Sequence, residues 1–266
     1  MLTDSHCHLA SHRFDADEVP TLIARAREAG VTRMISLVTD LDDLQANLEI
    51  AARHPEVFVC IGIHPCHVHE APDDAVDQLR PHLSNSRVCG IGETGLDYFH
   101  PAPDGWEETV YRKRQREFLE AHFLLAAEAG LNVVIHTRDK SGDASFQDAL
   151  EIYRRHSEKV HAVFHCFIGP EESARKVISL GGLVSFGGVA TFKNAPEVLA
   201  TATALPLGTF MVETDSPYLS PVPFRGKRNE PSYVRNVAEH LAESRDESLE
   251  QFAEATSAVA TGFFRL

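Results

Sequence analysis

The sequence predicts an α/β fold, a single (β/α)8 barrel of the TIM type that uses residues 1–266 as one domain. The length of 266 residues suits the roughly 250 residues that one such barrel needs. Short apolar runs alternate along the whole chain with amphipathic stretches, which is typical of repeated βα units and a parallel sheet. An open doubly wound sheet is the alternative, but no glycine-rich phosphate-binding motif follows the first expected strand.

Eight strands are expected, each a short run rich in apolar residues. They are Met1–His8, Arg33–Val38, Val57–Ile63, Val88–Glu93, Asn132–His136, His161–His165, Leu183–Phe186 and Phe210–Thr214. Helical periodicity predicts helices over Val19–Ala29, Leu41–Arg53, Ala75–Leu83, Val110–Ala129, Ala144–His156, Glu171–Leu180, Pro196–Ala202 and Tyr233–Glu243. Gly30, Gly130 and Gly181 follow helices as C-caps do. A final helix over Leu249–Phe264 is expected to pack outside the barrel.

The composition narrows the class of protein. At 43% hydrophobic residues the chain can form a large core, yet no apolar run approaches the roughly 18 residues of a membrane span. The first residues lack the basic start and apolar stretch of a signal peptide. Five cysteines without a disulfide framework predict reduced thiols and a cytoplasmic location.

The charge is strongly acidic, with 25 basic against 39 acidic residues and a net charge of −14. Such a surface does not favour tight binding along duplex DNA, which depends on phosphate neutralisation. Bound dications would still make one pocket locally positive. The charge therefore argues against a DNA-coating role and allows transient catalytic contact with a nucleic acid.

Six side chains that can bind a metal stand at the ends of expected strands. They are His6, His8, Glu93, His136, His165 and Asp215. Imidazole and carboxylate groups hold divalent metals, and the strand ends of a barrel meet at one rim. Each residue alone has a structural explanation, such as a hydrogen-bonded imidazole, a salt-bridged glutamate or an N-cap. Together they favour a site for two divalent metal ions, Mg, Mn or Zn, at the C-terminal rim.

Individual roles follow from position. His6 and His8 lie two apart on a strand and should point to the same face, where they can share one metal. Glu93 should bridge two metals, and Asp215 should bind metal and accept a proton from the attacking water. His64 ends the third strand, so it either contacts the scissile group or is a structural imidazole beside Pro65. Glu93, Asp215 and His64 are the candidate catalytic residues.

Eight short motifs in order carry a resemblance to a known family. They are Asp4-Ser5-His6-Cys7-His8-Leu9, Gly62-Ile63-His64-Pro65, Gly90-Ile91-Gly92-Glu93-Thr94-Gly95-Leu96-Asp97-Tyr98, Ile135-His136-Thr137-Arg138, Phe164-His165-Cys166-Phe167, Thr191-Phe192-Lys193-Asn194, Glu213-Thr214-Asp215-Ser216-Pro217-Tyr218-Leu219 and Arg225-Gly226-Lys227-Arg228-Asn229-Glu230-Pro231. Over nearly its whole length the chain resembles the TatD family of metal-dependent hydrolases, in the amidohydrolase-like superfamily.

The resemblance implies a TIM-like barrel and a two-metal centre. His6 and His8 would hold one metal, Glu93 would bridge, His136 and His165 would hold the other, and Asp215 would stand at the centre. Members commonly act as magnesium-dependent 3′–5′ deoxyribonucleases or ribonucleases.

This chain departs from the family's usual sequence pattern in two places. The segment Phe99–Thr109 is longer than in relatives and bears on substrate shape, and Thr256-Ser257-Ala258-Val259 lacks a common asparagine.

The predicted function is therefore hydrolysis by a metal-activated water. The leading form is a deoxyribonuclease or exonuclease that cleaves phosphodiester bonds, with single-stranded nucleic-acid ends as the preferred partner. An amidase or esterase acting on a small-molecule or aminoacyl carbonyl is the alternative. A noncatalytic scaffold has no need for six metal ligands. No membrane or obligate protein partner is expected.

Several cations and one aromatic residue could hold a nucleic-acid substrate. Arg138 and Lys193 are candidate phosphate holders, and loop salt bridges are their alternative. The basic run Arg225–Arg228 either follows a strand's backbone or forms internal ion pairs with Glu230 and neighbours. Trp106, the only tryptophan, either stacks on a base or packs its own loop.

Overall fold

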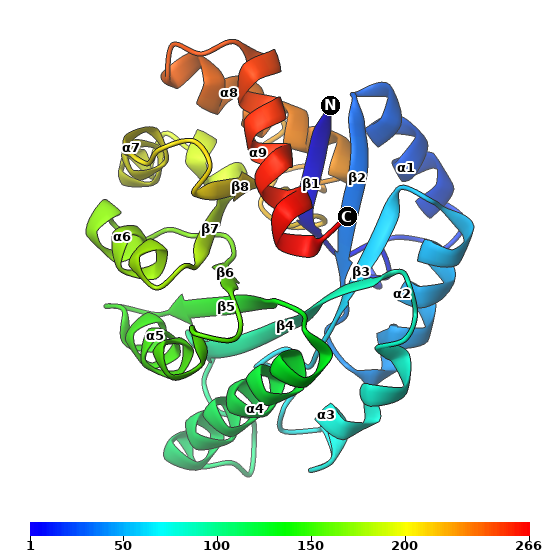
Figure 1. Ribbon diagram of the computed structural model, residues 1–266, viewed down its shortest axis with the longest axis vertical. Coiled ribbons are helices and arrows are strands. Elements are labelled where there is room, and N and C mark those ends of the chain that lie inside the picture. Colours follow the sequence, from blue (N-terminus) through cyan, green and yellow to red (C-terminus); the bar gives the residue numbers. More distant parts are fainter.

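The computed structural model describes residues 1–266 and confirms the (β/α)8 barrel (Figure 1). Eight parallel strands pair with their neighbours in chain order. They are β1 (Leu2–Cys7), β2 (Val31–Leu37), β3 (Val57–Ile61), β4 (Val88–Tyr98), β5 (Val133–Asp139), β6 (Ala162–Phe164), β7 (Leu183–Phe186) and β8 (Phe210–Val212). Between β8 and β1 the ring is joined by a single parallel bridge, Cys7 to Ser216, and the backbone N–H of His8 donates to the Ser216 carbonyl at 2.8 Å.

Helices surround the strands, as their amphipathic patterns predicted. They are α1 (Val19–Glu28), α2 (Leu41–Arg53), α3 (Ala75–Gln78), α4 (Glu108–Ala129), α5 (Ala144–His156), α6 (Glu171–Ser179), α7 (Pro196–Ala204), α8 (Val234–Ser244) and α9 (Leu249–Phe264). The three glycines expected to be C-caps all have positive φ. None of the helices is both long and apolar enough to cross a membrane.

The expected helix Ala75–Leu83 is wrong beyond its first turn. After α3 the chain continues as a 3-10 turn, η1 (Arg80–His82). Pro81 explains the break, because proline has no N–H to donate and its ring clashes with the carbonyl four residues earlier.

Strands β4 and β5 extend further than expected, past Glu93 and His136. Their pairing continues from Gly95 with His136 to Tyr98 with Asp139. Gly95 has φ +146°, and a Cβ there would lie 2.0 Å from the His136 carbonyl oxygen. The two backbones can run this close only because Gly95 has no side chain. The extension carries Asp97 to the rim beside His136.

Helix α9 does more than pack outside the barrel, which corrects the expectation. It contacts β1 and β8, and the C-terminus that follows it is drawn near β2 in Figure 1. Phe263 and Phe264 join an apolar cluster with Ile35, Val134 and Met211 from the strands. The side chain of Asn132, which immediately precedes β5, donates to the Phe263 carbonyl at 2.7 Å. The amino end of the barrel is thereby filled, and the carboxyl end is left for polar side chains.

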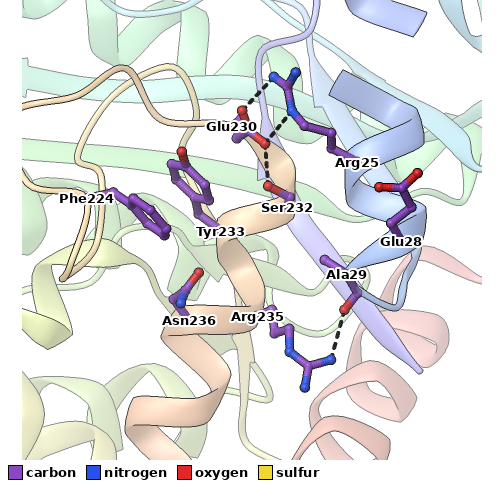
Figure 2. A pocket seen from close by; sticks show the side chains of 9 residues that line it. All are labelled: Arg25, Glu28, Ala29, Phe224, Glu230, Ser232, Tyr233, Arg235 and Asn236. Carbon is purple, nitrogen blue, oxygen red and sulfur yellow. Dashed lines mark hydrogen bonds and ion pairs between the residues drawn. The ribbon is translucent and has the colours of Figure 1, made fainter. Parts of the chain in front are cut away.

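A shallow cavity of about 540 Å³ lies between α1, the 3-10 turn η3 (Pro231–Tyr233) and α8 (Figure 2). Its cations are already paired. Arg25 donates twice to Glu230, at 2.9 and 2.7 Å, and Arg235 donates to Glu239 at 2.7 Å. None of the candidate metal ligands lines it. This cavity is therefore a surface feature of the helical layer and holds no cation free for a ligand.

We expect Gly95→Ala to lower the free energy of unfolding by about 3 kcal/mol, because the new methyl group meets the β5 backbone and the positive φ is strained. Urea denaturation measures this. Gly262→Ala is the control, because Gly262 lies in α9 with open space around its Cβ position. That change should be neutral or stabilise by up to about 1 kcal/mol. A loss below about 1 kcal/mol for Gly95→Ala would contradict the close approach described here.

Candidate active site

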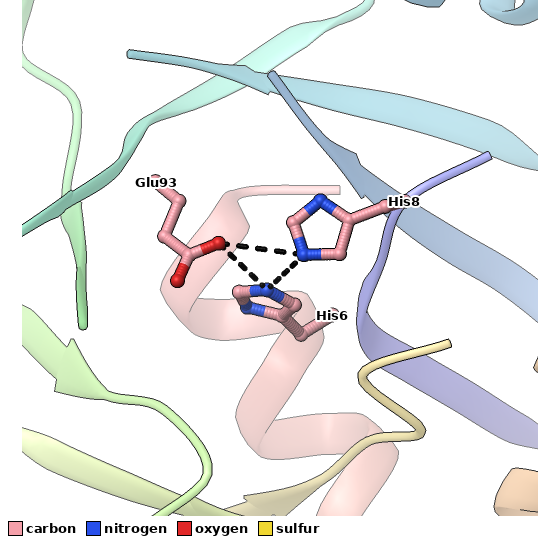
Figure 3. Close-up of side chains that lie close together, drawn as sticks. All are labelled: His6, His8 and Glu93. Carbon is pink, nitrogen blue, oxygen red and sulfur yellow. Dashed lines mark hydrogen bonds and ion pairs between the residues drawn. The ribbon is translucent and has the colours of Figure 1, made fainter. Parts of the chain in front are cut away.

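His6 and His8 converge at the end of β1, as their spacing predicted. Their Nε2 atoms lie 3.2 Å apart (Figure 3). Asp4 fixes this end of the strand, because its carboxylate accepts from the Thr214 backbone N–H at 2.8 Å and from the Thr214 hydroxyl at 2.7 Å. His8 Nδ1 lies 3.3 Å from the Leu37 carbonyl oxygen. The ring of His8 is thus oriented from behind and presents Nε2 to the rim.

Glu93 stands between two groups of histidines and divides its oxygens between them. Oε2 lies 3.3 Å from His6 Nε2 and 3.4 Å from His8 Nε2. Oε1 lies 2.9 Å from His136 Nδ1 and 2.8 Å from His165 Nε2. The side chain is almost fully buried. A carboxylate in this position can serve two cations, one through each oxygen.

Asp215 reaches the same place from the segment after β8, three residues beyond the strand's last residue. Its φ of +55° is a conformation that aspartate tolerates better than most residues. Its backbone N–H donates to the His6 carbonyl at 2.9 Å, and its Oδ1 lies 3.5 Å from His8 Nε2 and 3.8 Å from His6 Nε2. The turn after β8 therefore aims this carboxylate at the histidine pair.

His64 also faces the cluster. Its Nε2 lies 3.4 Å from Glu93 Oε1, and its ring meets the His136 ring edge-on at 4.5 Å. The backbone N–H of Cys66 donates to His64 Nδ1 at 3.1 Å. Nδ1 of His64 thus holds the loop after β3, and Nε2 faces the site. A structural role and a contact with the scissile group, the two alternatives for His64, are therefore compatible.

Two carboxylates that the site prediction omitted support the histidines from behind. Asp97 Oδ2 lies 3.2 Å from His136 Nε2. Glu213 Oε1 lies 3.4 Å from His165 Nδ1 and accepts from the Cys166 backbone N–H at 2.8 Å. Such partners orient metal-binding imidazoles. Both stand within motifs visible in the sequence, but only the fold shows which imidazole each one contacts.

Electrostatics in the cluster favour ionised carboxylates. Burial raises the pKa of Glu93, but the histidines around it outweigh burial and hold that pKa well below its usual range. Burial likewise raises the pKa of Asp215, and the hydrogen bond and charge of His8, with the other histidines, lower it overall. Burial lowers the pKa of His64 to about 4, so this imidazole is neutral at pH 7.

The donor set fits divalent cations. Three overlapping groups of ligand atoms lie within 4.8 Å of one another: His6, His8 and Glu93; His6, His165 and Asp215; and His64, Glu93 and His136. No lysine or arginine forms an ion pair with Glu93 or Asp215, so only imidazoles balance these buried charges. Burial lowers the pKa values of His8, His136 and His165, but the neighbouring carboxylates raise them overall. A bound cation would take the place of these protons, because metal binds ionised carboxylates and neutral imidazoles.

The residues proposed to hold a substrate differ in their exposure and ion pairing. Arg138 is exposed, makes no ion pair and lies over the Phe99 ring at 4.0 Å. Lys193 is exposed and also makes no ion pair. Arg228 pairs with Glu18, which also contacts Arg25, and Arg25 pairs with Glu230. The basic run therefore joins an internal ion-pair network that includes Glu230, as one of the two interpretations expected.

Trp106 packs its own loop, which is the second of the two interpretations made from the sequence. It is partly buried against the core and meets the Tyr111 ring at 6.2 Å, with Arg114 5.8 Å from its own ring. It therefore packs the loop between β4 and α4.

A parallel barrel with histidines and carboxylates gathered at the carboxyl rim is the architecture of metal-dependent hydrolases. The chain belongs to the TatD family, because the family model described as TatD related DNase matches residues 3–265. Among relatives, the uncharacterized metal-dependent hydrolase YabD of Bacillus subtilis is 33% identical over 267 residues, covering 100% of both chains. The corresponding protein YcfH of Escherichia coli is 35% identical over 261 residues, covering 96% of this chain and 92% of its own.

The fold has a close counterpart among solved structures. The TatD homologue YjjV of Escherichia coli superposes with a TM-score of 0.88 and 26% identity, covering 100% of this chain and 98% of its own. The chain is thus a metal-dependent hydrolase of the TatD family, and these relatives' names leave the substrate open.

We expect divalent metal to raise the melting temperature of the wild-type protein and to have little effect on Glu93→Gln, which keeps the shape of the side chain but removes its charge. A ligand at 100 times its Kd stabilises by about 2.7 kcal/mol, which for a chain of this size corresponds to roughly 5–10 °C. Thermal scans of chelator-treated protein with and without Mn²⁺ or Zn²⁺ measure the shift. Glu250→Gln, an exposed carboxylate in α9, is the control and should respond like wild type. An equal shift in Glu93→Gln would remove Glu93 from the metal site.

Proposed function

We propose that this protein is a two-metal nuclease that hydrolyses phosphodiester bonds at single-stranded or frayed nucleic-acid ends. The division of the Glu93 oxygens between His6 with His8 on one side and His136 with His165 on the other carries the proposal. Two cations on either side of one carboxylate match the arrangement that clamps a phosphodiester during displacement. The family's description as related to DNases supports the same substrate class.

We assign the two proposed metal positions to the residues present. His6, His8 and Asp215 with Glu93 Oε2 would hold one divalent ion, and His136 and His165 with Glu93 Oε1 the other. When bound, such ions act as Lewis acids that activate water and neutralise the phosphate oxygens. Mg²⁺, Mn²⁺ and Zn²⁺ are all compatible with mixed nitrogen and oxygen donors.

Asp215 is the proposed general base. Its carboxylate lies beside His6 and His8 at the open side of the site, with 13% of the side chain exposed. Its low pKa keeps it ionised near neutrality, so it can accept a proton. His64 Nε2 faces the opposite side of Glu93, where a neutral imidazole can donate a hydrogen bond to a substrate oxygen.

Side chains around the rim suit a nucleotide. Phe99, which Arg138 covers, is 39% exposed, and Tyr218, whose ring lies 6.1 Å from that of His8, is 38% exposed. Aromatic faces stack on bases without strong sequence preference, and arginine pairs with phosphate. A terminal nucleotide can use these contacts, whereas an internal duplex phosphate requires distortion that costs several kcal/mol.

We expect Asp215→Asn to lower kcat by about 10²-fold or more, because the amide cannot accept the proton. Asparagine tolerates the same positive φ, so the fold should be retained. Steady-state kinetics at saturating metal, with circular dichroism as the check on folding, measure this. Near wild-type turnover would exclude Asp215 as the base.

The substrate class is tested with single-stranded DNA, blunt duplex, closed circular duplex, RNA, and ester and amide compounds. We expect single strands to be cleaved at least about 10-fold faster than closed circular duplex, and EDTA to abolish the activity. Raising salt from about 50 to 200 mM should reduce the rate only modestly, because few phosphates are neutralised by side chains. Glu93→Gln prepared in parallel controls for contaminating nucleases. Carbonyl hydrolysis without any nuclease activity would replace this function with an esterase or amidase.

A further inference from the structure

A second set of metal-binding side chains lies on the rim beside the site. Cys66 comes from the loop after β3, Asp97 from the end of β4, and His100 from the loop after β4. His100 Nδ1 lies 3.1 Å from Asp97 Oδ2 and 3.8 Å from Cys66 Sγ, and one donor atom of each residue lies within 4.8 Å of the others. None of the three belongs to the ligand set assigned above.

The geometry distinguishes a metal site from a catalytic triad. In a Cys-His-Asp triad, the thiol and the carboxylate contact opposite nitrogens of the imidazole. Here both groups approach the same nitrogen, Nδ1 of His100. No proton can be relayed through the ring in this arrangement. Three donor atoms within 4.8 Å of one another are instead close enough to share one cation.

The spacing also suits zinc. With Zn–S of about 2.3 Å and Zn–N and Zn–O of about 2.0–2.2 Å, ligand atoms around one tetrahedral ion lie about 3.3–3.6 Å apart. The observed separations of 3.1 and 3.8 Å bracket this range. Small side-chain rotations are sufficient to close the site.

Two of the three donors are held in place before any ion binds. Asp97 Oδ1 accepts from the backbone N–H groups of Phe99 and His100, at 3.0 and 2.9 Å, which leaves Oδ2 facing the cluster. The backbone of Cys66 is held by its hydrogen bond to His64. The His100 side chain is half exposed, so an ion can enter from solvent and keep a position open to water.

We propose that Cys66, Asp97 and His100 form a third metal site, specific for a thiophilic divalent cation such as Zn²⁺. Its thiol distinguishes it from the nitrogen and oxygen donors of the main centre, because thiolate selects soft metals over Mg²⁺. Asp97 also contacts His136, so the third site adjoins the main centre through one carboxylate. The site does not depend on the identity of the substrate.

Metal binding to the full chain tests this proposal without any substrate. Chelator-stripped, reduced protein is dialysed against Zn²⁺, and bound metal per chain is measured. We expect Cys66→Ser and His100→Ala each to bind one ion fewer than wild type. With Co²⁺ in place of Zn²⁺, wild type should show thiolate-to-cobalt charge-transfer absorption in the near ultraviolet, and Cys66→Ser should lose it.

Two matched variants are the controls. Cys166 is the other partly exposed thiol, since Cys7, Cys60 and Cys89 are buried. Cys166→Ser should keep the cobalt band, and His12→Ala, at an exposed histidine, should keep the full metal count. The proposal is overturned if Cys66→Ser binds as many ions as wild type, or if the band disappears with Cys166 instead. Unchanged thermal unfolding of each metal-free variant shows that a lost ion does not reflect a lost fold.

Discussion

A single buried carboxylate organises this rim. Glu93 is only 2% exposed, and burying an ionised group costs several kcal/mol unless partners compensate it. The compensation comes from imidazoles alone, two on Oε2 and three on Oε1, all at 3.4 Å or less. A second layer of contacts orients three of these imidazoles: Asp97 contacts His136, Glu213 contacts His165, and the Leu37 carbonyl contacts His8. The proposed metal centre, the proposed base Asp215 and the adjoining thiol cluster all depend on that arrangement.

Barrel closure is the second requirement, because the ligands come from both ends of the chain. No full ladder joins β8 to β1. Asp4 instead clamps Thr214 through two hydrogen bonds, and Asp215 donates its backbone N–H to His6. These contacts bring the first and last ligands together. At the opposite end, Phe263 and Phe264 of α9 fill the barrel with apolar side chains. The apolar cluster and the polar site therefore lie at opposite ends of the barrel.

The loop after β4 contributes several side chains to the rim beside the site. It carries Phe99 under Arg138, and it brings His100 to Asp97 and Cys66. The same loop can therefore influence how a nucleotide approaches and whether a further cation binds nearby. Trp106 contributes by packing the loop.

The sequence by itself determined the order of elements and the candidate ligands. Apolar runs and amphipathic periods are local properties, so eight strands and most helices could be predicted within a few residues. The ends of parallel strands must meet at one rim. The sequence alone was therefore enough to group the six candidate ligands, His6, His8, Glu93, His136, His165 and Asp215.

Only the tertiary structure decided the features that depend on contacts between residues far apart in the chain. The extension of β4 follows from the contact of Gly95 with the β5 backbone, and the position of α9 follows from the empty end of the barrel. Similarly, the sequence could not say that Glu93 divides its oxygens between two histidine pairs, that Arg228 pairs with Glu18, or that Cys66 meets His100. The physical reason is that each of these contacts joins residues on different strands or loops. Side-chain distances between them are set by the packing of the whole barrel and leave no periodic signal in the chain.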